Sequence, residues 1–374
     1  MRAKGQFWGS VITDDEVDAL LRAHGEIDYT SMPDGLEDAI SASTALRDEA
    51  IGRLHRLRQS FDLDGDDTDL ILLALAPEIS AGYGKIFAYL NDNLNQAYLT
   101  VDLATRVLRK ERTKRLALQA RLMSSAPLIR NRLLLLNPPD GAETHTSRRV
   151  HPSSRLLRWL LENEELPPGL GFTPLSTEGA PLIAGRTMER IQQSLPSLER
   201  AIAVTIISGT SGAREGVAIA IARATQRPVV RIDLERCKPF LDQPWDLIRE
   251  LKLSGALPYV VNVASSQEDP QQKLQVLGLG AALATLPFPV LVGGSDRREV
   301  SGLLGAERPS LTVKVGRTNL DERIDSWIKH FDEKGWSTEN ATELAERFYS
   351  VGGTTINRIM ERAEIEAERA AAAE

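Results

Sequence analysis

From residue 203 to residue 316, apolar strand patterns alternate with helical patterns, and no other feature constrains the fold as strongly. Five apolar runs predict buried strands: AVTIISG, RPVVRIDL, LPYVVNVAS, FPVLVGGS and LTVKVG. Helical patterns follow the first three runs: REGVAIAIARAT, WDLIRELKLS and QQKLQVLGLGAALATL. Strands that alternate with helices build a parallel sheet with helices on both faces. The predicted fold class of this part is therefore α/β, with a doubly wound parallel sheet.

The part of the chain before residue 166 has helical patterns that lead into two strands. Helices are predicted from DDTDLILLALAPEI, SAGYGKIFAYLND and TVDLATRVLRKERTKRLALQARLM, strands from RNRLLLLN and RRVHP, and a last helix from SSRLLRWLLENEEL. Three helices followed by a strand, a turn and a returning strand are the layout of a winged helix. In the third helix we expect Thr100 to be the N-cap and one buried stripe to contain Leu103, Val107, Leu116 and Leu122.

These patterns divide the chain into five parts. We expect an acidic N-terminal extension (1–43), a winged-helix-like domain (44–170), a linker (171–184), an α/β core (185–316) and a helical lid (317–374). The linker is predicted from the Pro and Gly residues of PPGLGFTPLSTEGAPL. The lid is predicted from three helical patterns that follow Asn319.

Composition narrows the class of protein. The 374 residues are enough for two or three domains. The single cysteine, Cys237, excludes an internal disulfide and favours a reducing compartment. No apolar run predicts a signal peptide or a membrane span, so we expect a cytoplasmic protein without a membrane partner. The five histidines have no metal-ligand spacing, and no metal site is predicted.

Charge is distributed unevenly along the chain. Residues 1–105 hold 8 Lys/Arg and 19 Asp/Glu, whereas residues 106–158 hold 13 Lys/Arg and 3 Asp/Glu. The basic stretch RVLRKERTKRLALQAR could contact DNA phosphates, as winged helices do, or it could be a solvated helix face that answers the acidic region or a neighbouring subunit. The second interpretation is favoured because no basic arm lies beyond this stretch and the pI is 5.5. Nucleic acid is therefore not the expected partner.

The segment GTSGAREG has the outline of a phosphate-binding loop. In a GxxxxGK[ST] loop, backbone N–H groups cradle the phosphates, the lysine reaches the outer phosphates and the Ser/Thr hydroxyl holds Mg²⁺. Here Gly209 and Gly212 can form the turn, but Glu215 replaces the lysine and Gly216 the Ser/Thr. The candidate nucleotide-binding loop consists of Gly209, Thr210, Ser211, Gly212, Ala213, Arg214, Glu215 and Gly216.

These replacements predict weak nucleotide binding at most. A carboxylate about 4 Å from a phosphate charge costs roughly 4 kcal/mol near a protein surface, where a lysine would gain a similar amount. The strand PYVVNVASSQED ends in Asn262 instead of a metal-binding carboxylate, and FPVLVGGSDRR ends in Gly293, Gly294 and Ser295 where a water-positioning residue is expected. We therefore predict no catalytic residues and no bound cofactor, with ATP and Mg²⁺ binding weakly if at all.

The stretch ILLALAPEISAGYGKIFAYLNDNLNQAYLTVDLATRVL (71–108) resembles the variant winged-helix domain of AAA+ ATPases encoded with bacterial contractile injection systems. Residues 182–316 resemble an AAA+ core, and DERIDSWIKHF with ELAERFYSVGGTTINRIMERA resembles its helical lid. The resemblance implies a P-loop NTPase-like parallel sheet between helices. Such proteins often carry two AAA+ modules, of which the first is degenerate. The resemblance implies that this chain holds the winged helix and the degenerate module. It also suggests Arg297, Arg298 and Arg308 as intersubunit arginines, although each is more simply a surface residue.

Three functions follow from these observations. The leading hypothesis is an AAA+-like pseudo-ATPase that acts as an assembly or adaptor module. Its winged helix would recruit a protein partner, and its core would pack in a homo- or hetero-oligomer with AAA+ subunits. The first alternative is an ATP-hydrolysing remodeller that works through non-standard residues, a further AAA+ module or a partner subunit. The second is a winged-helix DNA-binding regulator.

Overall fold

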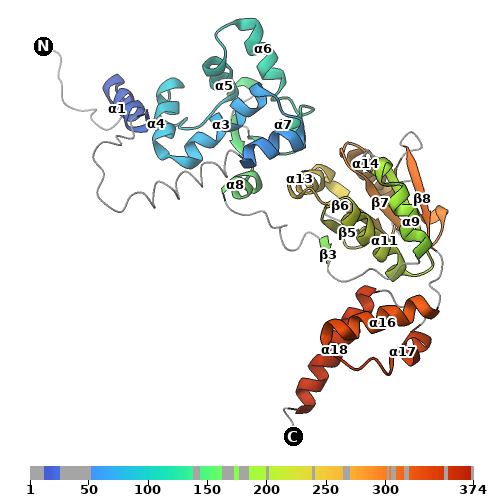
Figure 1. The fold of residues 1–374 in the computed structure, drawn as a ribbon. Helices are drawn as coiled ribbons and strands as arrows, with labels where there is room; N and C mark the ends of the chain where they lie inside the picture. The colour runs from blue at the N-terminus through green and yellow to red at the C-terminus, as the bar shows by residue number, and fades with distance from the viewer. Residues whose placement is uncertain are drawn as a thin grey trace, which may run out of the picture. The chain divides into compact units, whose positions relative to one another are not determined.

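The computed structural model separates the chain into two compact units, Met1–Glu164 and Glu165–Glu374, drawn in Figure 1. It describes residues 12–25, 52–137, 144–161, 172–176, 185–198, 202–237, 241–263, 270–300, 303–304, 309–315, 320–348 and 353–371. The five-part division of the chain stays a prediction at its boundaries. Most of the acidic extension lies outside the described residues.

The N-terminal unit consists of helices and one small sheet. Strand β1 (Leu134–Asn137) pairs antiparallel with β2 (Arg149–Pro152). Its helices are α1 (Asp14–Gly25), a helix over residues 52–61, α3 (Gly65–Ile79), α4 (Ala81–Leu90), α5 (Val101–Leu108), α6 (Arg112–Ala120), α7 (Pro127–Arg130), the 3-10 helix η1 (His145–Ser147) and α8 (Ser154–Leu161). The three helices that the sequence predicts before the hairpin correspond to α3, to α4 and to α5 with α6, and the short helix α7 precedes the β1–β2 pair.

Side-chain caps start the central helices of this unit. At α3, the Asp64 side chain accepts from the Asp67 N–H and the Asp67 side chain accepts from the Asp64 N–H, which is a capping box. At α5, the Thr100 hydroxyl accepts from the Leu103 N–H at 3.1 Å, as the sequence predicts. Among the described residues no single helix meets the length and apolarity needed to cross a bilayer, and α3 with α4 meets them only as a pair bent by 117°.

The prediction of one long third helix is wrong, because the helix is interrupted between Leu108 and Arg112 and forms α5 and α6. Leu103 and Leu122 are buried, but Val107 is 48% exposed and Leu116 is 60% exposed. A stripe with helical spacing stays on one face only while the helix is continuous. After the break, α6 turns a different side toward the core.

The C-terminal unit contains a six-stranded sheet in the order β3-β5-β6-β7-β4-β8. The strands are β3 (Phe172–Leu175), β4 (Ala203–Ile207), β5 (Val229–Asp233), β6 (Leu257–Val261), β7 (Val290–Gly294) and β8 (Ser310–Lys314). Strands β4 to β8 pair in parallel, and the runs predicted from the sequence occupy all five. The predicted α/β fold class is therefore confirmed.

The strand order determines where the helices lie. The connections from β5 to β6 and from β6 to β7 run in one direction across the sheet, whereas the connection from β4 to β5 runs in the other. Because parallel crossovers are right-handed, α11 (Ser211–Ala224) lies on one face, and α13 (Pro244–Ser254) and α14 (Pro270–Leu283) lie on the other. Such sheets bind ligands beyond the carboxyl end of the strand where the direction reverses, which here is β4.

Strand β3 lies inside the segment predicted as a linker. It pairs antiparallel with β5 at the edge of the sheet, with Phe172 opposite Ile232 and Leu175 opposite Val229. Its residue Pro174 cannot donate a backbone hydrogen bond, which is tolerated at an edge. The Pro and Gly residues around FTPL hide this short strand, because they are also typical of loops.

The remaining helices of this unit are α9 (Gly185–Gln193), α10 (Leu195–Leu198) and α15 (Arg297–Val300), and then α16 (Leu320–Lys334), α17 (Ala341–Arg347) and α18 (Gly353–Ala371). The last three are the helices predicted for the lid. They share a core of their own that includes Trp327, Phe331, Ile356 and Met360. Helix α18 also packs against α11.

Two glycines of α14 allow a matched test of how closely this helix packs against the segment that contains Leu303. A Cβ at Gly280 would lie 1.6 Å from the Leu303 carbonyl oxygen, whereas a Cβ at Gly278 would meet nothing within 4 Å. We expect Gly280→Ala to lower the free energy of unfolding by about 1–3 kcal/mol through overpacking. Gly278→Ala should raise it by up to about 1 kcal/mol through helix propensity. Urea unfolding of both variants measures this, and equal effects would contradict the close packing of α14.

Candidate functional site

The connection between β4 and α11 contains only Ser208, Gly209 and Thr210, because the helix begins at Ser211. Six of the eight residues predicted for the phosphate-binding loop, 211–216, are therefore helical. Gly212, expected in the turn, lies in the first turn of α11 and is buried, as is Gly216. Only Gly209 and Thr210 of the predicted loop lie in this connection, so most of the backbone N–H groups predicted to surround a phosphate belong to α11. Nucleotide binding by residues 209–216 stays a prediction.

Arg214 contacts both this short connection and strand β6. Its Nη1 donates to the Ser208 carbonyl oxygen at the end of β4. Its guanidinium also hydrogen-bonds the hydroxyl of Tyr259, on β6. Arg214 thus links the end of β4 to the middle of β6.

Glu215 faces the sheet and is only 6% exposed. Its Oε1 accepts from Nη1 of Arg231, on β5, at 2.8 Å. Arg231 also lies 3.4 Å from the carboxylate of Asp233. The expectation that Glu215 presents an unpaired charge to an approaching phosphate is therefore corrected, because an arginine of the neighbouring strand neutralises it.

The ends of β5 and β6 are joined by side-chain hydrogen bonds. Asn262 Nδ2 donates to Asp233 Oδ1 at 2.8 Å, and the Glu235 N–H donates to the same oxygen at 3.2 Å. Asn262 has a φ of 60°, in the left-handed region that Asn tolerates better than most residues. This residue, which stands where a metal-binding carboxylate is expected, links two strand ends.

Gly293 makes room for Tyr259. A Cβ at Gly293 would lie 2.6 Å from the Tyr259 hydroxyl oxygen. Tyr259 is 1% exposed, and burial raises the pKa of its hydroxyl to about 12, so the phenol is neutral at physiological pH. Packing thus accounts for the glycine at the end of β7, where the sequence pattern suggests a missing catalytic residue.

The residues after β7 form a local turn. The backbone N–H and the hydroxyl of Ser295 both donate to Glu299 at 2.6 Å, and these bonds lower the pKa of Glu299. Arg297 and Arg298 are exposed on α15, and Arg308 lies outside the described residues. Within the described part of the chain, no group of His, Cys, Asp and Glu is arranged to hold a metal ion.

Arg231 and Tyr259 do not stand out in the sequence as site residues, although a signal exists. Each is a polar residue in the middle of a strand that is otherwise apolar, RPVVRIDL and LPYVVNVAS. Parallel register places them side by side, Arg231 opposite Tyr259. A charged residue in a buried strand needs a partner, and Glu215 is that partner.

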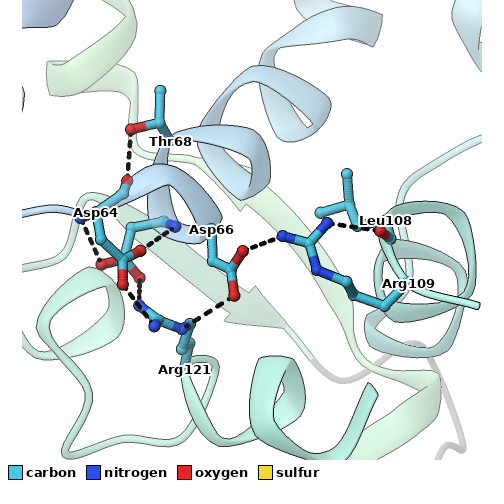
Figure 2. Close-up of polar contacts among 7 residues, drawn as sticks. Asp64, Asp66, Thr68, Leu108, Arg109 and Arg121 are labelled. Atoms are coloured by element: carbon cyan, nitrogen blue, oxygen red, sulfur yellow. Dashed lines mark hydrogen bonds and ion pairs between the residues drawn. The ribbon is translucent and has the colours of Figure 1, made fainter. Parts of the chain in front are cut away.

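The basic stretch of the N-terminal unit is engaged by carboxylates at the start of α3, as Figure 2 shows. Arg121 lies 2.6 Å from Asp64, 3.0 Å from Asp67 and 3.8 Å from Asp66, and Arg109 also pairs with Asp66. Residues of the acidic and basic segments of the sequence therefore form ion pairs with each other within one unit. This is the interpretation favoured from the charge pattern.

Smaller pairs continue along this surface. Arg106 pairs with Asp102 at 2.8 Å, and Lys114 pairs with Glu111 at 3.0 Å. Arg115 donates to the Arg109 carbonyl oxygen at 2.9 Å. Exposed pairs of this kind add little stability, but they reduce the positive potential that a DNA duplex would meet.

Comparison with known proteins supports the winged helix directly. The family described as "Winged helix domain, variant" matches residues 35–170. No curated protein matches this chain.

Solved structures that resemble the chain do so at low identity. Replication initiator DnaA bound to AMPPCP and single-stranded DNA is 9% identical, with a TM-score of 0.31, over 47% of this chain and 59% of that chain. The FIGL-1 AAA domain in complex with ADP is 10% identical, with a TM-score of 0.35, over 50% of this chain and 72% of that one. The HORMA:CdnC:Trip13 complex of E. coli MS115-1 is 14% identical, with a TM-score of 0.28, over 44% and 74%. The chain spans less than two thirds of the DnaA structure's length, and these likenesses concern fold alone.

The Glu215–Arg231 pair can be tested by reversing one charge. Glu215→Lys would place an ammonium group against Arg231, and we expect it to lower the free energy of unfolding by about 3–5 kcal/mol. Exchanging the two charges, Glu215→Lys with Arg231→Glu, should recover part of this loss. Chemical denaturation of the unmodified chain, the single variants Glu215→Lys and Arg231→Glu, and the double variant gives the coupling energy. Unfolding free energies that simply add would contradict a direct interaction.

The Arg121 cluster predicts a dependence of stability on pH. Burial acts to raise the pKa of Asp64, but hydrogen bonds from the Asp67 N–H and Arg121 lower it below its ordinary value of 3.8. A lowered pKa in the folded state adds stability that is present above this value and lost as the pH falls below it. We expect Arg121→Ala to cost about 1–3 kcal/mol at neutral pH, with a smaller effect in acid. Thermal unfolding across the acid range measures this, with the exposed Arg112→Ala as the control.

Proposed function

We propose that the chain is a non-catalytic, AAA+-like adaptor, a pseudo-ATPase, whose winged helix recruits a protein partner and whose core packs in an oligomer. One observation supports the loss of catalysis most strongly. The position of the loop lysine is held by Glu215, which is buried and paired with Arg231 at 2.8 Å. The early start of α11 and the position of Arg214 support the same conclusion.

Nucleotide binding would require the start of α11 and its contact with β5 to rearrange. A cradle of the usual length would have to unwind residues 211–216, and Glu215 would have to leave Arg231. Breaking a buried ion pair costs about 3–5 kcal/mol, which is on the order of two to four powers of ten in affinity. Neither the end of β6 nor the end of β7 supplies a carboxylate to hold a metal in return.

The surface of α6 supports a protein partner. Leu116 is exposed, and so are Ala117 and Ala120 on the same helix. Helices that read DNA bases present Arg, Lys, Asn or Gln at such positions, because these side chains match the donors and acceptors of base edges. Small and apolar side chains instead match the surface of another protein.

The rest of the proposal depends on the sequence resemblance. Oligomerisation with AAA+ subunits and an association with a contractile injection system are suggested by residues 71–108 and 182–316. A cytoplasmic location is suggested by the sequence pattern, in which no apolar run predicts a signal peptide or a membrane span. An active AAA+ module in a partner subunit, or elsewhere in a longer polypeptide, would supply any hydrolysis.

Titration of the purified chain with a fluorescent ATP analogue and Mg²⁺ tests the proposal. We expect no saturable binding in the micromolar range and no release of phosphate. The double variant Glu215→Lys with Arg231→Ala, checked for folding, should not gain hydrolysis, because the connection after β4 remains three residues long. Stoichiometric micromolar binding with turnover by the unmodified chain would reject a pseudo-ATPase and favour the remodelling enzyme.

A further inference from the structure

Helix α1 lies against α4 in the N-terminal unit, as Figure 1 shows. The Thr13 hydroxyl accepts from the Glu16 N–H at 3.3 Å, so the helix has its own N-cap. The winged-helix family matches residues 35–170, and α1 (Asp14–Gly25) precedes this range. Residues 26–51 separate α1 in the sequence from the next described helix. Helix α1 is therefore an accessory segment on the surface of the winged helix.

Carboxylates of α1 meet hydrogen-bond donors of α4. Glu16 accepts from the Lys85 ammonium group at 3.2 Å, and Asp14 accepts from the Tyr89 hydroxyl. The hydrogen bond to Asp14 raises the pKa of Tyr89, so the phenol stays protonated and remains a donor. Of the α1 side chains that the structure describes, only Val17 is buried. The structure thus shows which kind of helix this face of α4 accepts: an acidic one with an apolar anchor.

The contact has the properties of one that can be exchanged. The Lys85 and Glu16 side chains are 58% and 42% exposed, so water screens their ion pair and it adds little stability. A helix held in this way depends on belonging to the same chain, because linkage raises its effective concentration. Tyr89, Leu90 and Leu94 line one pocket and stay exposed with α1 in place. Apolar side chains gathered at a surface often mark an interaction site.

We propose that α1 is an autoinhibitory helix. It occupies a docking face of α4 that receives an acidic amphipathic helix of a partner protein once α1 has left. The partner helix has two carboxylates that replace Asp14 at Tyr89 and Glu16 at Lys85, and an apolar residue in the place of Val17. Apolar anchors at helical spacing give such a helix its affinity, and the charged contacts determine its orientation.

This inference rests on the proposed recruitment of a protein by the winged helix, and it names a surface, a class of partner and a means of control. The probe is a fluorescein-labelled peptide of residues 12–25, and the receptor is the full chain. The variant Glu16→Lys with Val17→Asp releases α1 and leaves α4 unaltered, which faster hydrogen exchange in residues 14–25 verifies. We expect this variant to bind the peptide at least about tenfold more tightly than the unmodified chain, because its own α1 no longer competes.

Matched variants locate the contact. Asp15→Lys, a charge reversal at an exposed residue next to Glu16, should leave peptide binding as weak as in the unmodified chain. Adding Lys85→Glu to the releasing variant should weaken peptide binding by about three- to tenfold, and a peptide with Glu16→Lys should restore it. Thermal unfolding verifies that all the variants fold. Equal peptide binding by the releasing variant and the unmodified chain would overturn autoinhibition, and insensitivity to Lys85→Glu would overturn the α4 face.

Selection of phage-displayed peptides on the releasing variant tests the partner. We expect enriched peptides to have two carboxylates and an apolar residue spaced as in α1, and to be displaced by the peptide of residues 12–25. Peptides that bind the winged helix without being displaced would overturn the α4 face and leave recruitment intact. No enrichment on either chain would overturn both proposals.

Discussion

The ion pair between Glu215 and Arg231 joins helix α11 to strand β5. It lies near the carboxyl ends of the parallel strands, where ligands of this fold class bind. A buried carboxylate and a partly buried guanidinium need each other, because either one alone would be a desolvated charge. The pair holds the second turn of α11 against the sheet. The connection from β4 has three residues, and Arg214 hydrogen-bonds Ser208 within it and Tyr259 on β6.

This arrangement changes the physical reason to expect weak nucleotide binding. From the sequence, the argument is electrostatic, since Glu215 would repel a phosphate. In the structure Arg231 neutralises Glu215, and residues 211–216 are already helical. Gly293 and Asn262 are likewise engaged by neighbouring strands. Gly293 leaves space for Tyr259, and Asn262 donates a hydrogen bond to Asp233.

Internal pairing of charge also organises the N-terminal unit. Asp64, Asp66 and Asp67 open α3, and Arg121 joins them to the segment that follows α6. Opposite charges of neighbouring sequence segments thus pair with each other inside this unit.

The sequence by itself determined the α/β class, the five parallel strands, the winged-helix hairpin and the Thr100 cap, because periodicity and capping residues are local properties. It did not determine the edge strand β3 or the break between α5 and α6, since Pro, Gly and a basic run are compatible with either a loop or a regular element. Only the tertiary structure decided what Glu215 contacts. Its partner Arg231 is on another strand, and only parallel register with Tyr259 and the crossover through α11 bring the three together.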